Sequence, residues 1–252
     1  IELTVGEGWY CSGVSAFRYR YGDQSAVCAQ LTMDNLTIGT DETWSAYESP
    51  IRFSSIYDGE RVDLTAERSR LTPMEVPYDK NLLVDQICEP VRDIERIGVK
   101  EVIITPAGER VYDFGQNLVG AVEIKTPSDF HGTITMCFAE ILVDGNFYTE
   151  NLRGAKATDS FTALGAHTFS PEFTFHGFRY MKIEGADLPA DSVTAVVRHT
   201  DMKRTGYIRT GNARFDKFLQ NVVWGQRCNF LDLPTDCPQR DERLGWTGDT
   251  QI

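Results

Sequence analysis

The sequence lacks three features that would each indicate a class of protein. No apolar run in its 252 residues approaches the ~20 residues that a membrane-spanning helix needs. Basic residues are in the minority, because 25 Lys and Arg stand against 37 Asp and Glu, for a formal net charge of -12. A surface of that sign repels phosphates, so the composition argues against nucleic acid as a partner. Neutral or weakly charged partners remain open.

Cysteine and histidine are also sparse. The six Cys and four His are spread along the chain without a C-x-x-C pair or the spacing of zinc ligands. Asp144-Gly145-Asn146 is a turn signal and not a calcium loop, because the other ligands of an EF-hand are missing. We therefore expect no metal and no cofactor. Cys28 and Cys137 lie in apolar, strand-like runs, and we expect both to be buried thiols.

The two ends of the chain carry no start or stop signal. The first residues are Ile1-Glu2-Leu3, with no initiator Met and no signal-peptide core. The last residues, 250–252, interrupt a region with a helical pattern. We expect the chain to be an internal piece of a longer protein, and its compartment stays open between the cytoplasm and a periplasmic or secreted location.

The first 60 residues have the pattern of short strands and turns. The β-forming runs 27–33 and 37–38 flank Asp34-Asn35, which predicts a hairpin. The loop 6–13 is rich in glycine and aromatic residues and has two interpretations. It is either a sugar-binding loop or a tight sheet corner that packs Trp9, and the second is favoured.

A polar stretch over residues 61–90 separates this region from a second series of strands. Three prolines and no clean periodicity predict a connector there. The strand signals that follow are 99–104, 121–125, 132–138 and 194–198. Strands at short spacing without intervening helices predict a β-sandwich over residues 91–200, and not a doubly wound α/β fold.

The period of the apolar residues changes after residue 200. Residues 212–229 carry apolar side chains at the i, i+3, i+4, i+7 and i+8 spacing of an amphipathic helix. These side chains are Phe215, Phe218, Leu219, Val222 and Val223. The change predicts that a helical domain begins at about residue 201.

The segment after this helix is expected to be extended and then helical again. Pro234 disfavours the helical conformation at Leu233. Asp236 has the side chain of an N-cap, Pro238 suits a first turn, and Gly245 suits a helix end. These signals predict a short helix between Asp236 and Gly245.

The densest chemistry lies between Leu233 and Asp249. This run holds four acidic residues, two arginines and a tryptophan. Carboxylates accept hydrogen bonds from sugar hydroxyls and transfer protons, and an indole offers an apolar plate for a ring. The run therefore predicts a pocket for a polar, ring-shaped ligand. The alternative is that the same acids cap helices and form ion pairs.

The run Asn229–Asp249, with Asp-Cys-Pro-Gln-Arg-Asp-Glu-Arg-Leu-Gly-Trp at its centre, closely resembles the active-site segment of the inverting bacterial and fungal α-L-rhamnosidases. Upstream segments look like the β-sandwich that precedes the catalytic barrel of that family; they are 112–117, 139–140, 148–153, 157–159 and 175–180. Residues 1–60 look like the second half of its N-terminal, carbohydrate-module-like β domain.

The resemblance implies a mainly β fold. Two antiparallel β-sandwich or jelly-roll-like units, at 1–60 and 91–200, would be joined by the connector 61–90. Residues 201–252 would then form the first helices of an (α/α)6 barrel that holds the active site.

The resemblance also implies roles for particular residues. Glu242 matches the general acid, and Asp236, Trp246 and Asp249 match the sugar subsite, with Arg240 beside them as a further substrate-binding residue. The general base of the family lies in a later part of the barrel, so no residue of this chain is given that role.

The charges around Glu242 leave the pKa of this carboxyl open. Inverting hydrolysis needs one protonated carboxyl and one carboxylate, ~6.5 to 9.5 Å apart. Asp241 would raise the pKa of Glu242 by repulsion, whereas Arg240 and Arg243 would lower it. Partial burial near Trp246 suits a carboxyl that keeps its proton.

The expected function is release of terminal α-L-rhamnose from rhamnose-containing oligosaccharides, polysaccharides or glycosides, and the chain alone is expected to be inactive. The alternative is a non-catalytic carbohydrate-binding or scaffolding β module. Glu140 and Glu150 are other carboxylates, but they lie in the β unit and are expected not to touch the substrate. His176 and Arg179 are expected to bind at a domain interface.

Overall fold

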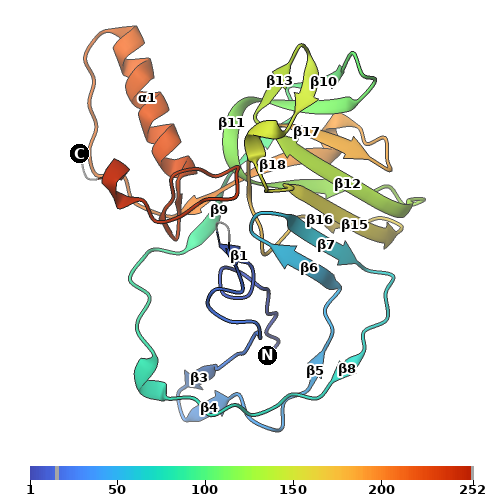
Figure 1. The fold of residues 1–252 in the computed structure, drawn as a ribbon, viewed down its shortest axis with the longest axis vertical. Helices are drawn as coiled ribbons and strands as arrows, with labels where there is room; N and C mark the ends of the chain where they lie inside the picture. The colour runs from blue at the N-terminus through green and yellow to red at the C-terminus, as the bar shows by residue number, and fades with distance from the viewer. Residues whose placement is uncertain (15–16, 251–252) are drawn as a thin grey trace.

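The computed structural model describes residues 1–14 and 17–250 (Figure 1). The predicted fold class, mainly β, is confirmed. The α-helix of the described part is α1 (Ala213–Cys228). None of the helices described is long and apolar enough to cross a membrane.

Ten strands form one curled sheet. Eight follow one another as neighbours: β6 (Ile51–Ser55), β7 (Gly59–Asp63), β15 (Thr158–Leu164), β12 (His131–Ala139), β17 (His176–Glu184), β11 (Arg110–Lys125), β18 (Val193–Thr200) and β9 (Val91–Gly98). Two more, β10 (Glu101–Ile104) and β16 (Thr168–Phe169), pair with β11. Every pairing in this sheet is antiparallel except β7 with β15, which is parallel.

The hydrophobic core lies inside this curled sheet. Alternate residues of each strand point inward, as the period of two requires. The buried set includes Ile134, Met136 and Phe138 of β12 and Val193, Ala195 and Val197 of β18. Each large apolar side chain buried in this way stabilises the fold by roughly 1.5 to 3 kcal/mol.

The long strand β11 bends so that it can pair on several sides. Its register with β17 shifts between Asp113 and Leu118. Gly120 follows the shift with a φ of 149°, and a Cβ at this position would collide with the carbonyl oxygen of Val196 on β18. Only glycine allows the two strands to approach so closely.

The expected domain boundary at residue 60 falls inside strand β7. Residues Arg61–Asp63 pair with Ser160–Thr162 of β15, so the hairpin β6–β7 extends the large sheet. The pairing satisfies backbone groups that an edge strand would leave open. The stretch expected to be a connector is irregular only after β7, and contains β8 (Arg70–Leu71) and the 3₁₀ turn η1 (Lys80–Leu82).

The rest of the N-terminal region consists of small two-stranded pieces. They are β1 (Gly13–Val14) with β2 (Phe17–Arg18), β3 (Gln30–Met33) with β4 (Leu36–Gly39), and β5 (Ala46–Tyr47) with β8. The hairpin predicted around Asp34-Asn35 is confirmed. The sheet corner predicted for Trp9 also forms, because the indole packs edge-on against Tyr57 with the ring centroids 5.9 Å apart.

The prediction of a buried Cys28 was wrong. Cys28 is exposed, because it lies just before the hairpin β3–β4, which stands apart from the large sheet and is not covered by a second layer in the described part of the chain (Figure 1). Cys137, inside β12, is half-buried. All six cysteines are free thiols.

Short elements complete the chain. Strands β13 (Ile141–Val143) and β14 (Asn146–Tyr148) form a hairpin at the turn that the sequence predicted for Asp144-Gly145-Asn146. The others are the 3₁₀ turns η2 (Glu150–Leu152), η3 (Ala190–Ser192) and η4 (Thr247–Thr250) and the pair β19 (Phe230–Leu231) and β20 (Leu233–Pro234).

Helix α1 matches the prediction for residues 212–229. The side chain of Asn212 caps it by accepting hydrogen bonds from the backbone N–H groups of Arg214 and Phe215. The helix stands beside the large sheet (Figure 1), to which Trp224 joins it by donating a hydrogen bond to the carbonyl of Asn117 at 2.8 Å. Its apolar face is uncovered in the described part of the chain, where Phe218 is 58% exposed.

Candidate active site

The segment after β20 carries the predicted site, but the short helix predicted there does not form. The chain has no regular structure between Thr235 and Trp246. Asp236 accepts a hydrogen bond from the side chain of Arg240, at 2.9 Å, in place of the backbone N–H groups that a helix cap would bind. Arg243 has a φ of 52°, which a right-handed helix excludes.

Arg243 anchors this segment to the large sheet. Its side chain is 1% exposed, and Nη1 donates to the carbonyls of Ile56 and Phe175 at 2.7 and 3.0 Å. The guanidinium lies over the rings of Phe175 and Tyr57, at 4.8 and 5.3 Å from the centroids. Burial lowers the pKa of Arg243 to about 10, so the group stays charged at neutral pH. The charge binds carbonyls and rings of the sheet.

Two further contacts bring the segment close to the sheet. The hydroxyl of Tyr57 donates to the carbonyl of Glu242 at 2.6 Å. A Cβ on Gly177 of β17 would lie 2.7 Å from Cγ of Pro238 and 3.1 Å from the backbone nitrogen of Gln239. The absence of a side chain at Gly177 therefore lets the segment pack directly on β17.

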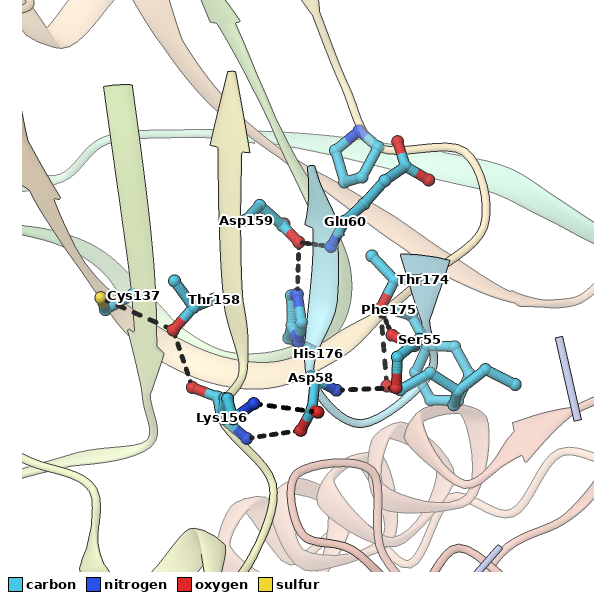
Figure 2. Close-up of polar contacts among 12 residues, drawn as sticks. Ser55, Asp58, Glu60, Cys137, Lys156, Thr158, Asp159, Thr174, Phe175 and His176 are labelled. Carbon is cyan, nitrogen blue, oxygen red and sulfur yellow. Dashed lines mark hydrogen bonds and ion pairs between the residues drawn. The ribbon is translucent and has the colours of Figure 1, made fainter. Parts of the chain in front are cut away.

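A buried polar network lies in the part of the sheet that the segment contacts, and Figure 2 shows its members. Asp159 of β15 accepts hydrogen bonds from the backbone N–H of Glu60, at 2.8 Å, and from Nε2 of His176, at 3.1 Å. The hydroxyl of Thr174 donates to the carbonyl of Ser55 at 2.9 Å. These bonds hold together the strands that present the carbonyls of Ile56 and Phe175 to the buried arginine.

The residues expected at a domain interface lie elsewhere. His176 is fully buried in the core of the sheet and stacks on Phe138, with centroids 4.4 Å apart. Arg179 binds both carboxylate oxygens of Asp113 at 2.8 Å. Both residues stabilise the large sheet itself.

Four of the five predicted site residues lie together: Arg240 and Trp246 bind the carboxylate of Glu242, and Asp236 is joined to it through Arg240. Arg240 Nε donates to its Oε2 at 3.0 Å, and Trp246 Nε1 donates to its Oε1 at 3.2 Å. Arg240 also binds Asp236 and so bridges the two acids. The fifth residue, Asp249, lies in η4, and its side chain is outside the described part of the structure.

Arg153 also binds Glu242, and the sequence analysis assigned it no role. Its Nη1 donates to Oε2 of Glu242 at 3.0 Å from the loop after η2. One signal for Arg153 was present in the sequence, because the segment 148–153 resembles the family. That resemblance did not indicate a contact between Arg153 and Glu242. The hydrogen bond from Arg240 lowers the pKa of Glu242, and Trp246 and the charge of Arg153 lower it further. The carboxylate is therefore anionic at neutral pH in this arrangement.

The donor atoms at the site do not suit a metal ion. Oxygen atoms of Asp236 and Glu242 and the sulfur of Cys237 lie within 4.8 Å of one another. Arg240 already supplies a positive charge to both carboxylates. Burial raises the pKa of the Cys237 thiol to about 11, and a protonated thiol is a poor ligand.

The site has two features that suit a sugar. Trp246 is 51% exposed, so part of its apolar surface is accessible to a ligand. Oδ1 of Asp236 and Oε1 of Gln239 are buried and have no hydrogen-bond partner among the described residues. Buried acceptors of this kind ordinarily bind a donor, and sugar hydroxyls are donors.

Three family models match consecutive parts of the chain. The α-L-rhamnosidase N-terminal domain matches residues 1–95, the bacterial α-L-rhamnosidase concanavalin-like domain matches 103–199, and the bacterial α-L-rhamnosidase 6 hairpin glycosidase domain matches 203–252. All three belong to the same kind of enzyme, and they follow in the order that the sequence resemblance implied.

Individual relatives agree with these models. An α-L-rhamnosidase of Streptomyces avermitilis is 37% identical over 280 residues, which cover 100% of this chain and 27% of the relative. The crystal structure of a native α-L-rhamnosidase from Aspergillus terreus superposes with a TM-score of 0.90 at 38% identity, over 97% of this chain and 31% of that one. The S. avermitilis enzyme complexed with L-rhamnose gives a TM-score of 0.85 at 37% identity, over 96% and 26%. The chain thus spans less than a third of each relative.

Proposed function

This chain belongs to the bacterial α-L-rhamnosidase family, and on that premise we propose that the whole protein is a glycoside hydrolase that releases terminal α-L-rhamnose from glycans or glycosides. The observation that carries the proposal is the carboxylate of Glu242, held between two arginines and an exposed indole. Glycoside hydrolysis uses a carboxyl group as its acid, and an indole offers an apolar surface for a sugar ring.

In this proposal the rhamnose ring lies against Trp246. Its hydroxyls donate hydrogen bonds to the buried acceptors of Asp236 and Gln239, which have no partner among the described residues, once the side chains that cover these atoms move on binding. Arg240 orients the side chain of Asp236, because it donates a hydrogen bond to one oxygen of that carboxylate. The neutral sugar fits a region where the fixed charges already compensate one another.

The reaction follows the inverting scheme. Glu242 gives a proton to the glycosidic oxygen while the bond from that oxygen to C1 breaks. A water molecule attacks C1 from the opposite face and gives its proton to a second carboxylate, ~6.5 to 9.5 Å from the first. We place this second carboxylate, the general base, in a part of the whole protein outside this chain.

Glu242 must bind a proton before it can act as an acid. Its contacts with Arg240 and Arg153 oppose this, because both favour the anion. Arg153 is the more exposed partner, with 60% of its side chain accessible. We propose that substrate binding displaces Arg153 and shields the carboxyl from water, and both changes raise the pKa of Glu242.

The first test is the variant Glu242→Gln in the whole protein. We expect kcat/KM on a rhamnosyl disaccharide to fall by roughly 10²- to 10⁴-fold, the usual contribution of a general acid. Rhamnosyl fluoride should lose far less, because fluoride leaves without a proton. Glu150→Gln is the matched control, since this exposed carboxylate accepts a hydrogen bond from Tyr148 and is not among the partners of Glu242 in the described part of the chain. Equal losses on both substrates would exclude a general-acid role.

The second test separates the enzyme from a non-catalytic carbohydrate-binding module. An aryl α-L-rhamnoside is incubated with this chain alone and with the whole protein. We expect turnover by the whole protein only, because the chain supplies one of the two carboxylates. Turnover by the isolated chain at a comparable rate would refute an external base, and none by the whole protein would favour the module.

A further inference from the structure

A pocket of about 170 Å³ lies between the candidate catalytic segment and the N-terminal loop. Its walls come from distant parts of the chain. They include Tyr19, Phe53 and Ser55 of β6, Asp58 of the β6–β7 turn, Gly154 and Asp241. At ~30 Å³ per water this volume corresponds to roughly five or six molecules, which suits one sugar ring and not a polymer.

The lining of the pocket has the chemistry that recognises a neutral sugar. Tyr19 and Phe53 supply aromatic surface, and the hydroxyls of Ser12 and Ser55 lie 3.1 Å apart. The carboxylate of Asp58 is paired with Lys156 at 3.4 Å, an ion pair visible in Figure 2. Hydroxyl and carboxylate oxygens beside aromatic rings bind sugar hydroxyls and ring faces, whereas acidic groups repel anionic sugars.

Two residues that line the pocket are neighbours in sequence of Glu242 and of its partner Arg153. Asp241 precedes Glu242 in the chain, and Gly154 follows Arg153, which binds the Glu242 carboxylate. The backbone N–H of Gly154 donates to Oδ2 of Asp241 at 3.2 Å, which fixes that carboxylate. Tyr57, another lining residue, holds the carbonyl of Glu242. The pocket thus adjoins the segment that carries Glu242.

A general acid protonates the oxygen that links two sugar units, so the two units must lie on either side of it. We propose that the pocket binds the neutral sugar on the leaving-group side of the bond that Glu242 protonates. This inference rests on the proposed function and adds the site for the second half of the substrate. It gives the loop 6–13 a role in sugar binding in addition to packing Trp9.

The test uses the whole protein and compares two kinds of substrate. One is α-L-rhamnosyl fluoride, whose leaving group is too small to fill the pocket. The other is the best-cleaved member of a panel of neutral disaccharides in which L-rhamnose is α-linked to D-glucose at different positions. The readout is the ratio of kcat/KM for the disaccharide to kcat/KM for the fluoride.

Two variants change the pocket in independent ways. Tyr19→Ala removes an aromatic wall from a side chain that is 56% exposed, so it should leave the fold intact. Gly154→Ala places a Cβ 2.5 Å from Oδ2 of Asp241 and pushes that flexible carboxylate aside. Tyr47→Ala is the matched control, because Tyr47 is 50% exposed and does not line the pocket.

We expect the ratio to fall about tenfold in each pocket variant and to stay constant in Tyr47→Ala. An unchanged ratio in both pocket variants would overturn the inference, even if both rates fell together. A wild-type protein that cleaves the fluoride but no disaccharide would overturn it as well. Failure of the wild type on every substrate would instead refute the proposed function.

Discussion

The carboxylate of Glu242 shows how much a single residue depends on neighbours that are distant in sequence. Arg240 and Trp246 are within four positions of it, but Arg153 comes from the loop after η2, 89 positions earlier in the chain. Glu242 is anionic in this arrangement because both arginines favour the charge. The control of the proton at this site is therefore shared between the catalytic segment and the β region.

The variant Arg153→Gln should reveal this control in the pH dependence of the whole protein. Loss of the cation raises the pKa of Glu242. An acid catalyst works while protonated, so activity falls as the pH rises through its pKa. We therefore expect the alkaline limb of the profile of kcat/KM to move to higher pH.

Arg52→Gln is the control for the loss of a paired arginine, since Arg52 forms an ion pair with Glu48 and not with Glu242. Its profile should match the wild type. An alkaline limb in Arg153→Gln that stays in place or moves to lower pH would contradict a link between Arg153 and the proton of Glu242.

At the scale of elements, the hairpin β6–β7 carries more of the site than its place near the N-terminus suggests. It pairs with β15, presents the carbonyl of Ile56 to Arg243, and binds the loop before β17 through Glu60. The carboxylate of Glu60 accepts hydrogen bonds from the backbone N–H groups of Glu172 and Phe173. Burial raises its pKa from 4.5 to about 7.

This buried carboxyl predicts a pH dependence of stability. Because the pKa of Glu60 is higher in the folded state, its contribution to stability is complete below pH 4.5 and is lost as the pH rises through about 7. The loss amounts to roughly 3 kcal/mol. The side chain in Glu60→Gln cannot ionise. Its free energy of unfolding, measured with urea, should therefore change less between these pH values than that of the wild type.

The exposed Glu75 offers the control for this measurement, and Glu75→Gln should retain the wild-type profile. If Glu60→Gln kept the full pH dependence, another buried group would have to be its source. Glu60 also affects the candidate site, because it binds the loop that contains Phe173 and Phe175, and the carbonyl of Phe175 accepts a hydrogen bond from Arg243.

At the scale of the whole molecule, the clearest feature is an apolar helix face with nothing over it in the described part of the chain. Phe215, Phe218 and Val222 of α1 are 57%, 58% and 51% exposed. The chain spans less than a third of the rhamnosidases that it resembles, and α1 falls in the part matched by their 6 hairpin glycosidase domain. We propose that the rest of that helical domain covers this face.

The variant Phe218→Ser tests this proposal. In the isolated chain the free energy of unfolding should change by no more than about 0.5 kcal/mol, because the side chain is already exposed. In the whole protein the same change should cost roughly 1.5 to 3 kcal/mol, the value of one large buried apolar side chain. Lys217→Ser, at the next position of α1, should be neutral in both. Equal effects of Phe218→Ser in the two proteins would refute the covered face.

The sequence by itself determined the features that depend on local pattern. The period of two predicted the strands, the period of 3.6 and Asn212 predicted α1, and a run of consecutive residues around Glu242 identified the family. The same run named Asp236, Arg240 and Trp246, because neighbours in sequence stay neighbours in space. A local pattern was misleading where a long-range contact opposed it, as in the helix predicted between Asp236 and Gly245.

Only the tertiary structure decided the features that depend on contacts between distant residues. Arg153 reaches Glu242 across 89 positions, Arg243 buries its charge against the carbonyls of Ile56 and Phe175, which lie next to the ends of β6 and β17, and β7 pairs with a strand almost 100 residues later. The local sequence around either partner does not predict such a contact. The pKa of Glu242 is lowered first by its sequence neighbour Arg240 and further by Trp246 and by the distant Arg153. The effect of Arg153 depends on the fold, since charge interactions depend on distance in space and not on position along the chain.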